Sequence, residues 1–141
     1  FRFVYKQALE GHHTHPISDV SSTHEPEYAE HTLAPVVQFA AADEGGTITI
    51  WDAAEMLPSK EVKVPGECFT SLKIRGDRIL ASTLSGKICI FSVSQQRLQC
   101  EISAHARGIN AIALHPYMEW VASVSEDTYV NVWNIEGLLT Q

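Results

Sequence analysis

Cysteine is scarce in this chain, and long apolar runs are absent from it. The 141 residues include only Cys68, Cys89 and Cys100, and no two of them form a C-x-x-C pair. An odd number at these spacings indicates neither a disulfide framework nor a cysteine zinc site. No apolar run approaches the ~18–20 residues of a membrane span, and no signal-peptide pattern is visible. We therefore expect an intracellular, cytoplasmic protein with no membrane span.

Basic residues are missing from a long stretch of the chain. Between Gln7 and Ser59 there is no Lys or Arg, while nine acidic residues occur there. Residues 60–107 hold eight bases against four acids, and the rest of the chain holds four acids and no base. The net charge of −7 argues against nucleic acid as the main partner. The charge alternation either orients segments in an assembly or reflects solvated surfaces that happen to differ.

Helical periodicity is nearly absent, and strand-like segments recur instead. Three similar segments each end in an aromatic residue, at Trp51, Phe91 and Trp133, with separations of 40 and 42 residues. Each follows a turn signal such as Gly45-Gly46 or Ser85-Gly86, and each turn follows an apolar segment of small residues. The repeat predicts an all-β protein, with a propeller, a sandwich and a barrel as candidates.

The pattern predicts twelve short strands, grouped as one, four, four and three. The expected strands are Arg2–Leu9; Ile17–Ser21, Val36–Ala42, Thr47–Trp51 and Glu61–Val64; Phe69–Ile74, Arg78–Thr83, Lys87–Val93 and Arg97–Ile102; Ile109–Leu114, Trp120–Ser125 and Tyr129–Asn134. Only residues 53–57 suit a helical turn, which Pro58 would end. Residues 21–33 form a polar segment that we interpret as a surface insertion.

The third unit resembles a repeat of the WD-repeat family of β-propellers. Ala104-His105 stands where a Gly-His pair begins such a repeat, and Trp133 ends the unit. The resemblance implies a hydrogen-bonded tetrad of His105, Ser125, Asp127 and Trp133. These groups suit one another, because a carboxylate and a hydroxyl can pair with the two imidazole nitrogens and a buried Trp N–H needs an acceptor.

The other two units are weaker copies of this repeat. Gly11-His12 begins the first unit and Trp51 ends it, and Asp43 stands at the hydroxyl position. The resemblance thus implies a degenerate tetrad of His12, Asp43 and Trp51. In the second unit only Thr83 remains, because Phe91 replaces the Trp and Gly66-Glu67 has no His. We expect packing, and not a polar network, to hold this second blade together.

The resemblance implies about three four-stranded antiparallel blades of a partial WD40-type propeller. The predicted division is an outer strand of a preceding blade in 1–10, a blade in 11–64, a degenerate blade in 65–103, and a blade lacking its outer strand in 104–141. Three blades are too few for a closed ring, since propellers need ~4–8. We expect either a missing half of the propeller or a second copy of this chain to close the ring.

Chemistry-bearing clusters offer alternatives to a purely structural role. Five histidines and three Glu residues occur between His12 and His31, which makes a small-molecule- or metal-binding propeller an alternative, although the spacing matches no ligand frame. His105, Ser125 and Asp127 could be mistaken for a hydrolase triad, but their spacing fits the structural tetrad better. We expect no enzyme activity, no cofactor and no native metal site.

WD propellers usually bind partners on the face that carries the loop before each innermost strand and the turn between the second and third strands. The resemblance therefore implies a non-catalytic protein-interaction scaffold with a protein or peptide partner. The candidate partner-binding face comprises Pro16, Ser18, Glu44, Cys68, Thr70, Leu84, Arg107, Asn110 and Glu126.

Overall fold

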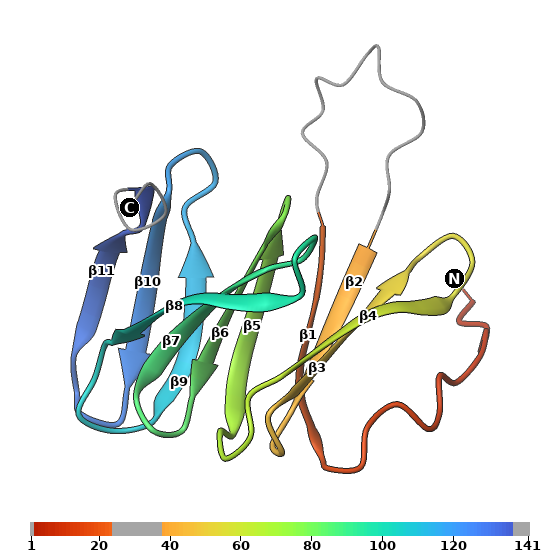
Figure 1. The fold of residues 1–141 in the computed structure, drawn as a ribbon, viewed down its shortest axis with the longest axis horizontal. Helices are drawn as coiled ribbons and strands as arrows, with labels where there is room; N and C mark the ends of the chain where they lie inside the picture. Colours follow the sequence, from red (N-terminus) through yellow and green to blue (C-terminus); the bar gives the residue numbers. More distant parts are fainter. Residues whose placement is uncertain (1, 24–37, 137–141) are drawn as a thin grey trace.

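A computed structural model describes residues 2–23 and 38–136, which form eleven strands in three antiparallel sheets (Figure 1). The first sheet holds β1 (Ile17–Ser22), β2 (Gln38–Asp43), β3 (Thr47–Asp52) and β4 (Leu57–Lys63). The second holds β5 (Phe69–Arg75), β6 (Arg78–Thr83), β7 (Lys87–Ser92) and β8 (Arg97–Ser103). The third holds β9 (Ile109–Leu114), β10 (Trp120–Ser125) and β11 (Val130–Asn134). The predicted all-β, partial-propeller fold is confirmed.

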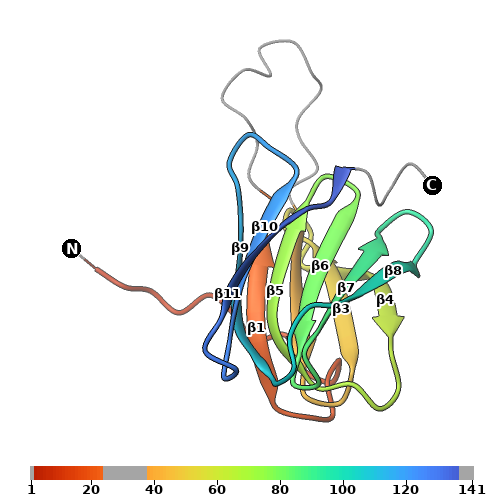
Figure 2. The ribbon, with the colours of Figure 1, turned by 90° about the vertical axis from the view of Figure 1, so that its left-hand side faces the viewer.

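The sheets stand face to face in one row, with β1, β5 and β9 as neighbouring innermost strands (Figures 1 and 2). Within each sheet the strands follow chain order, and each strand pairs antiparallel with the next. Positive-φ glycines make the turns between the second and third strands of the first two sheets possible, at Gly46 (φ 88°) and Gly86 (φ 89°). The described residues contain no helix long and apolar enough to cross a membrane.

Two apolar layers fill the spaces between the sheets. The layer between the first and second sheets is built around Ile48, Ile50, Phe69, Leu72 and Phe91, none of which is more than 1% exposed. The layer between the second and third sheets includes Leu80, Ile88, Ile90, Ile112 and Val121. The second sheet is therefore buried on both faces, whereas the first and third sheets each have one face without a neighbouring sheet in the described residues.

The predicted strand at Arg2–Leu9 is wrong for this structure, because residues 2–10 have no regular secondary structure. None of the three sheets includes this segment, which extends away from them in Figure 2. The fourth strand of the first sheet begins earlier than predicted, at Leu57. Pro58 lies inside it, which is possible because β4 is an outer edge strand where a missing N–H breaks no ladder.

The predicted insertion at residues 21–33 falls mostly outside the described residues. Its first two members, Ser21 and Ser22, belong to β1, where they pair with Ala40 and Phe39 of β2.

Candidate functional site

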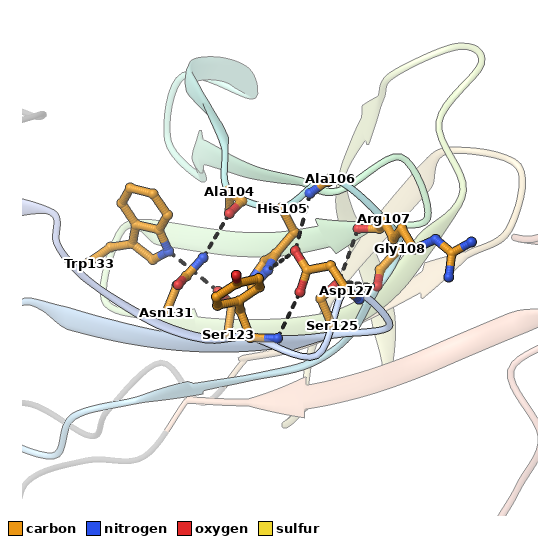
Figure 3. Close-up of polar contacts among 11 residues, drawn as sticks. Ala104, His105, Ala106, Arg107, Gly108, Ser123, Ser125, Asp127, Asn131 and Trp133 are labelled. Atoms are coloured by element: carbon orange, nitrogen blue, oxygen red, sulfur yellow. Dashed lines mark hydrogen bonds and ion pairs between the residues drawn. The ribbon is translucent and has the colours of Figure 1, made fainter.

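The third sheet holds a continuous polar network around a buried histidine (Figure 3). The Nδ1 atom of His105 lies 2.9 Å from Oδ2 of Asp127, and its Nε2 atom lies 2.7 Å from Oγ of Ser123. Trp133 Nε1 donates to the same Ser123 hydroxyl at 3.4 Å. The network joins the loop before β9 to β10, to β11 and to the turn between those two strands, so it fixes four segments relative to one another.

The protons of this network can be assigned from its chemistry. Asp127 only accepts when ionised, so the Nδ1 atom of His105 donates to it and the Nε2 atom accepts from the Ser123 hydroxyl. Burial acts to raise the pKa of Asp127. Hydrogen bonds from the Tyr129 amide, the His105 ring and the Ala106 amide outweigh burial, so the pKa lies below its ordinary value.

The hydroxyl of this network belongs to Ser123, and the sequence-based placement of Ser125 in it is wrong. Ser125 lies two residues further along β10 than Ser123, at the end of the strand, where the pairing with β9 skips Asn110. The Ser125 hydroxyl instead donates to the backbone oxygen of Gly108 at 2.9 Å and accepts from the Asp127 amide at 3.1 Å. It therefore ties the turn after β10 to the loop before β9. His105, Asp127 and Trp133 come together as the family pattern implies.

The first sheet carries a partial version of the same network. Its histidine is His13, not the predicted His12: the His13 Nδ1 atom lies 2.7 Å from Oδ2 of Asp43. His13 stands four residues before β1, just as His105 stands four residues before β9. His12 instead packs edge-on against the ring of Trp51, with 5.6 Å between the ring centroids. The Gly-His dipeptide therefore identified the loop but not the ring that reaches the carboxylate.

Asp43 both accepts from the backbone amides of the turn and accepts from the histidine ring. In the third sheet Ser125 accepts from a turn amide, and Asp127 accepts from the histidine ring. Its Oδ1 atom accepts from the amides of Gly45 and Thr47, both at 2.9 Å, and its Oδ2 atom accepts from His13. Burial is the largest single influence on the pKa of Asp43, which is 1% exposed, and it acts to raise that pKa. Together, the hydrogen bonds from the His13 ring and from the Thr47 and Gly45 amides outweigh burial. The pKa of Asp43 is therefore lowered, and the carboxylate is charged at neutral pH.

The bridging hydroxyl is missing from the first sheet. Trp51 pairs with Phe39 and Thr49 pairs with Ala41, as Trp133 pairs with Val121 and Asn131 with Ser123. Ala41 thus occupies the place of Ser123. Among the described residues, Trp51 Nε1, His13 Nε2 and Thr49 Oγ1 are the buried side-chain polar atoms with no hydrogen-bond partner. Trp51 and Thr49 lie on the same face of the sheet as Ala41. Because Ala41 has no hydroxyl where the third sheet has Ser123, the Trp51 and His13 nitrogens lack the partner that Trp133 and His105 have.

The second sheet has apolar groups at the serine and tryptophan positions of the network. The residues equivalent to Ser123 and Trp133 are Ala81 and Phe91, and Phe91 packs edge-on against Phe69 with 6.2 Å between the ring centroids. Its remaining polar groups are paired, because Ser85, at the position of Asp127, donates to Glu67 at 2.9 Å and lies 2.9 Å from the Thr83 hydroxyl. This sheet therefore has no unpaired buried group among the described side chains. Thr83 accepts from the Lys87 amide at 3.0 Å and thereby holds the turn.

Side chains on the innermost strands bind the sheets to one another. Asp19 Oδ2 on β1 accepts from the Leu72 amide of β5 at 2.8 Å and from the Ser71 hydroxyl at 3.2 Å. The Ser71 Oγ atom in turn accepts from the Ile112 amide of β9 at 3.4 Å. Asp19 and Ser71 are each the third residue of their strand, so the same kind of contact links the first sheet to the second and the second to the third. Sequence reasoning missed it, although the shared strand position of Asp19 and Ser71 is a readable signal.

One rim of the molecule, which we call the loop rim, brings the predicted partner-binding residues together (the lower edge in Figure 1). In every sheet the amide at the start of the turn after the second strand donates to the residue before the innermost strand. The bonds run from Glu44 to the Pro16 oxygen at 3.0 Å, from Leu84 to Cys68 at 2.9 Å, and from Glu126 to Gly108 at 3.1 Å.

The loop rim is continuous from sheet to sheet. Gly46 accepts from the Val64 amide in the loop that leads to the second sheet, and Gly86 accepts from the His105 amide in the loop that leads to the third. A Cβ atom on either glycine would collide with a backbone oxygen of that loop. Of the predicted face, Pro16, Ser18, Glu44, Leu84, Arg107, Asn110 and Glu126 are exposed, and Cys68 and Thr70 are half-buried.

The Cys68 thiol on the loop rim is not an activated nucleophile. Burial raises the pKa of the Cys68 thiol, and the nearby carboxylates of Glu44, Asp43 and Glu67 raise it further, so the thiol stays protonated. In residues 2–23 and 38–136, no three His, Cys, Asp or Glu side chains gather as a metal site would require. His24 and His31, which belong to the metal-binding alternative, lie outside the described residues.

Comparison with known proteins extends over nearly the whole chain. The model of the WDR54 family matches residues 2–138. WD repeat-containing protein 54 of Mus musculus is 29% identical over 135 residues, which cover 94% of this chain and 38% of that protein. The human protein of the same name is 27% identical over the same shares. A more distant similarity is to the human tRNA (34-2'-O)-methyltransferase regulator WDR6, 29% identical over 70% of this chain and 9% of that protein.

These relatives carry the same kind of repeat that the tetrad and the strand spacing indicate. The chain spans 38% of the length of its WD repeat-containing protein 54 relatives, so it corresponds to a part of their length. The resemblance to WD repeats is therefore confirmed, and the chain belongs to the WDR54 family.

Proposed function

We propose that this chain is a non-catalytic WD-repeat scaffold segment that binds a protein or peptide on the loop rim. The main support is the repeated bond from Glu44 to Pro16, from Leu84 to Cys68 and from Glu126 to Gly108, which holds six loops on one edge at fixed positions. Binding residues held on loops by a rigid sheet scaffold lose little conformational entropy when a partner docks.

The composition of the loop rim suits a polypeptide partner. Leu84 is 56% exposed and lies near the centre of the row, with Glu44 on one side and Arg107 and Glu126 on the other. An exposed apolar group surrounded by charges of both signs is typical of a protein interface with a small apolar centre. The net charge of −7 and the acidic first segment make nucleic acid an unfavourable partner. A cytoplasmic location is part of the proposal, because the three cysteines are free, as is usual in a reducing compartment.

Charge reversal on the loop rim tests this proposal. Two variants, Arg107→Glu and Glu126→Lys, should each weaken binding of the partner at least ~10-fold, as expected for the loss of about 1.4 kcal/mol. A photo-reactive residue at position 84 should crosslink the same partner in cells, which identifies it by mass spectrometry. Glu55→Lys is the matched control, because Glu55 is exposed on the turn between β3 and β4 at the opposite edge. Equal loss in all three variants, or no crosslinked protein, would refute the proposal.

A further inference from the structure

A pocket lies between the second and third sheets, beside the turn from β5 to β6 and the turn from β9 to β10 (the upper edge in Figure 1). Leu80 of β6, Leu114 of β9 and Ile135 beyond β11 give it an apolar lining. Leu80 and Ile135 are buried, and Leu114 is half-buried. Because both sheets that form the pocket belong to this chain, it does not depend on where the sequence begins or ends.

The size of the pocket favours a polypeptide over a small molecule. Its volume of about 230 Å³ is below the ~300–1,000 Å³ that is usual for small-molecule sites. A space of this size with an apolar lining suits one large apolar side chain, such as those that anchor protein partners in pockets.

Two arginine side chains stand at the mouth of the pocket. Arg75, the last residue of β5, pairs with Arg78, the first residue of β6. Arg75 donates from Nη2 to the His115 oxygen at 2.8 Å and from Nη1 to the Met118 oxygen at 3.4 Å. Arg78 Nη1 donates to Oε2 of Glu119 at 2.7 Å. Because a guanidinium group carries several N–H donors and no acceptor, these bonds leave most of its donors without a partner in residues 2–23 and 38–136.

Acidic side chains at the mouth do not use up these donors. Asp77 and Glu119 also line the pocket, so the formal charges of the site balance. However, the Asp77 carboxylate already accepts from the Ser92 hydroxyl at 2.8 Å, and from the amide and the hydroxyl of Ser94 at 2.8 Å and 2.9 Å. Glu119 accepts from Arg78. The free hydrogen-bonding capacity is therefore mainly that of donors, and a carboxylate is an acceptor that matches a guanidinium group in charge and geometry.

The surroundings of the pocket also favour an acidic partner. Residues 60–107, which include the whole second sheet, hold eight bases against four acids. A partner segment rich in Asp or Glu therefore approaches a part of the chain with net positive charge, which favours its association.

The third-sheet side of the pocket is held rigidly. His115 Nδ1 accepts from the amides of Tyr117 and Met118, both at 3.1 Å, which fixes the turn between β9 and β10. Arg75 ties this turn to the second sheet through the His115 and Met118 oxygens. Tyr117 is 92% exposed in this turn. Tyr and Arg are enriched among the residues that dominate binding energy, and a pre-organised site loses little entropy when a partner docks.

We propose that this site, which we call the arginine pocket, is a second docking surface and binds an acidic peptide segment of a partner protein. One large apolar side chain of the segment enters between Leu80, Leu114 and Ile135. A neighbouring Asp or Glu of the segment pairs with the free donors of the Arg78 guanidinium group. The arginine pocket lies at the edge opposite the loop rim, so the proposal does not rest on the function proposed above.

Peptide selection tests the chemistry of this partner. Heptapeptides selected from a random display library on the whole natural chain should carry a large apolar residue next to Asp or Glu. Arg78→Glu should weaken their binding at least ~10-fold, because it replaces donors by a repelling carboxylate. Arg78→Lys keeps the charge but loses the planar fork, so it should weaken binding less than Arg78→Glu. Arg107→Glu is the matched control, since it reverses an exposed arginine on the loop rim and should leave this binding unchanged.

Charge reversal of the peptide distinguishes a lost contact from unfolding. The Arg78–Glu119 ion pair is solvent-accessible and contributes little stability, so Arg78→Glu should fold. A selected peptide made with Lys in place of its acids should bind Arg78→Glu more tightly than it binds the wild type. A photo-reactive group at the apolar position of the selected peptide should crosslink to Leu80, Leu114 or Ile135.

Several results would overturn the proposal. Selection of no peptide, or of basic or uncharged peptides, contradicts the chemistry of the site, and crosslinks to any other part of the chain contradict its position. Peptides whose binding falls in Arg107→Glu and not in Arg78→Glu would also overturn the arginine pocket, and they would support the loop rim instead.

Discussion

Ala41 occupies in the first sheet the place that Ser123 occupies in the third, and the loss of one hydroxyl leaves two buried groups unpaired. Ser123 accepts from Trp133 and lies 2.7 Å from the Nε2 atom of His105. Trp51 Nε1 and His13 Nε2 have no such partner among the described residues. The three sheets thus show a complete network, a broken one and an apolar replacement, and only the broken one carries an energetic penalty.

We predict that Ala41→Ser stabilises the protein. The new hydroxyl can accept from Trp51 and donate to His13, as Ser123 does with Trp133 and His105. Two neutral hydrogen bonds that also satisfy buried groups should raise the free energy of unfolding by about 1–2 kcal/mol. Urea denaturation followed by tryptophan fluorescence measures this change.

Ala40→Ser is the matched control for that prediction. Ala40 is adjacent in β2, is 0% exposed and packs in the apolar layer against the second sheet. A hydroxyl buried there without a partner should lower the free energy of unfolding by about 1–3 kcal/mol. Opposite signs for the two variants support the network in the first sheet, whereas destabilisation by both would contradict it.

Acid should weaken the fold through Asp43 and Asp127. Both carboxyls have a pKa below the ordinary value of 3.8, so between their folded pKa and about pH 5 the unfolded chain binds more protons than the folded chain. Their stabilisation is therefore present above the unfolded pKa and is lost as the pH falls through the folded pKa. Unfolding midpoints in urea, measured at several pH values from 7 to 3, should decrease in this window.

Asp127→Asn isolates the contribution of the third sheet to that pH dependence. The amide still fits beside His105 but does not titrate, so the decrease of stability between about pH 5 and pH 3 should become shallower than in the wild type. Asp52→Asn is the control, because Asp52 caps the exposed turn at Ala54 and Glu55 outside either network. An unchanged slope in Asp127→Asn would show that this carboxylate is not coupled to folding.

The strand order was predictable from the sequence because its signals are local. Alternating apolar residues and turn glycines such as Gly46 and Gly86 lie within a few positions of the strands that they define. Arg2–Leu9 was mispredicted because the same alternation forms a strand only when it joins a ladder, and this segment belongs to none of the three sheets. Local pattern alone does not report whether a segment joins a ladder.

The polar networks were predictable by residue type but not by position. A one-residue difference in the loop decides whether His12 or His13 reaches Asp43, and a two-residue step along β10 decides whether Ser123 or Ser125 meets the histidine. Both depend on backbone geometry that motif spacing does not contain. Once the strands are registered against one another, the same sequence does reveal that Ala41 lacks the hydroxyl of Ser123.

The link between the first two sheets should depend on Asp19. Asp19→Ala removes the acceptor of the Leu72 amide. This amide belongs to β5, and the Leu72 side chain is 0% exposed. An unpaired buried amide should lower the free energy of unfolding by about 1–3 kcal/mol, and hydrogen exchange of the Leu72 amide should accelerate. Glu61→Ala, which removes only an exposed ion pair with Lys63, should change stability by less than about 1 kcal/mol. Equal effects of the two variants would contradict a role for Asp19 between the sheets.

A final prediction separates backbone strain from close packing at the loop rim. Gly86 and Gly66 have nearly equal positive φ angles of 89° and 86°, so alanine strains the backbone at either position by about 1–2 kcal/mol. At Gly66 a Cβ meets nothing within 4 Å, whereas at Gly86 it collides with the backbone oxygens of His105 and Arg107. Gly86→Ala must therefore also displace the loop that carries His105, and it should lower the melting temperature clearly more than Gly66→Ala. Differential scanning calorimetry of both variants measures the difference, and equal shifts would mean that the turn after β6 does not hold the third sheet's histidine loop in place.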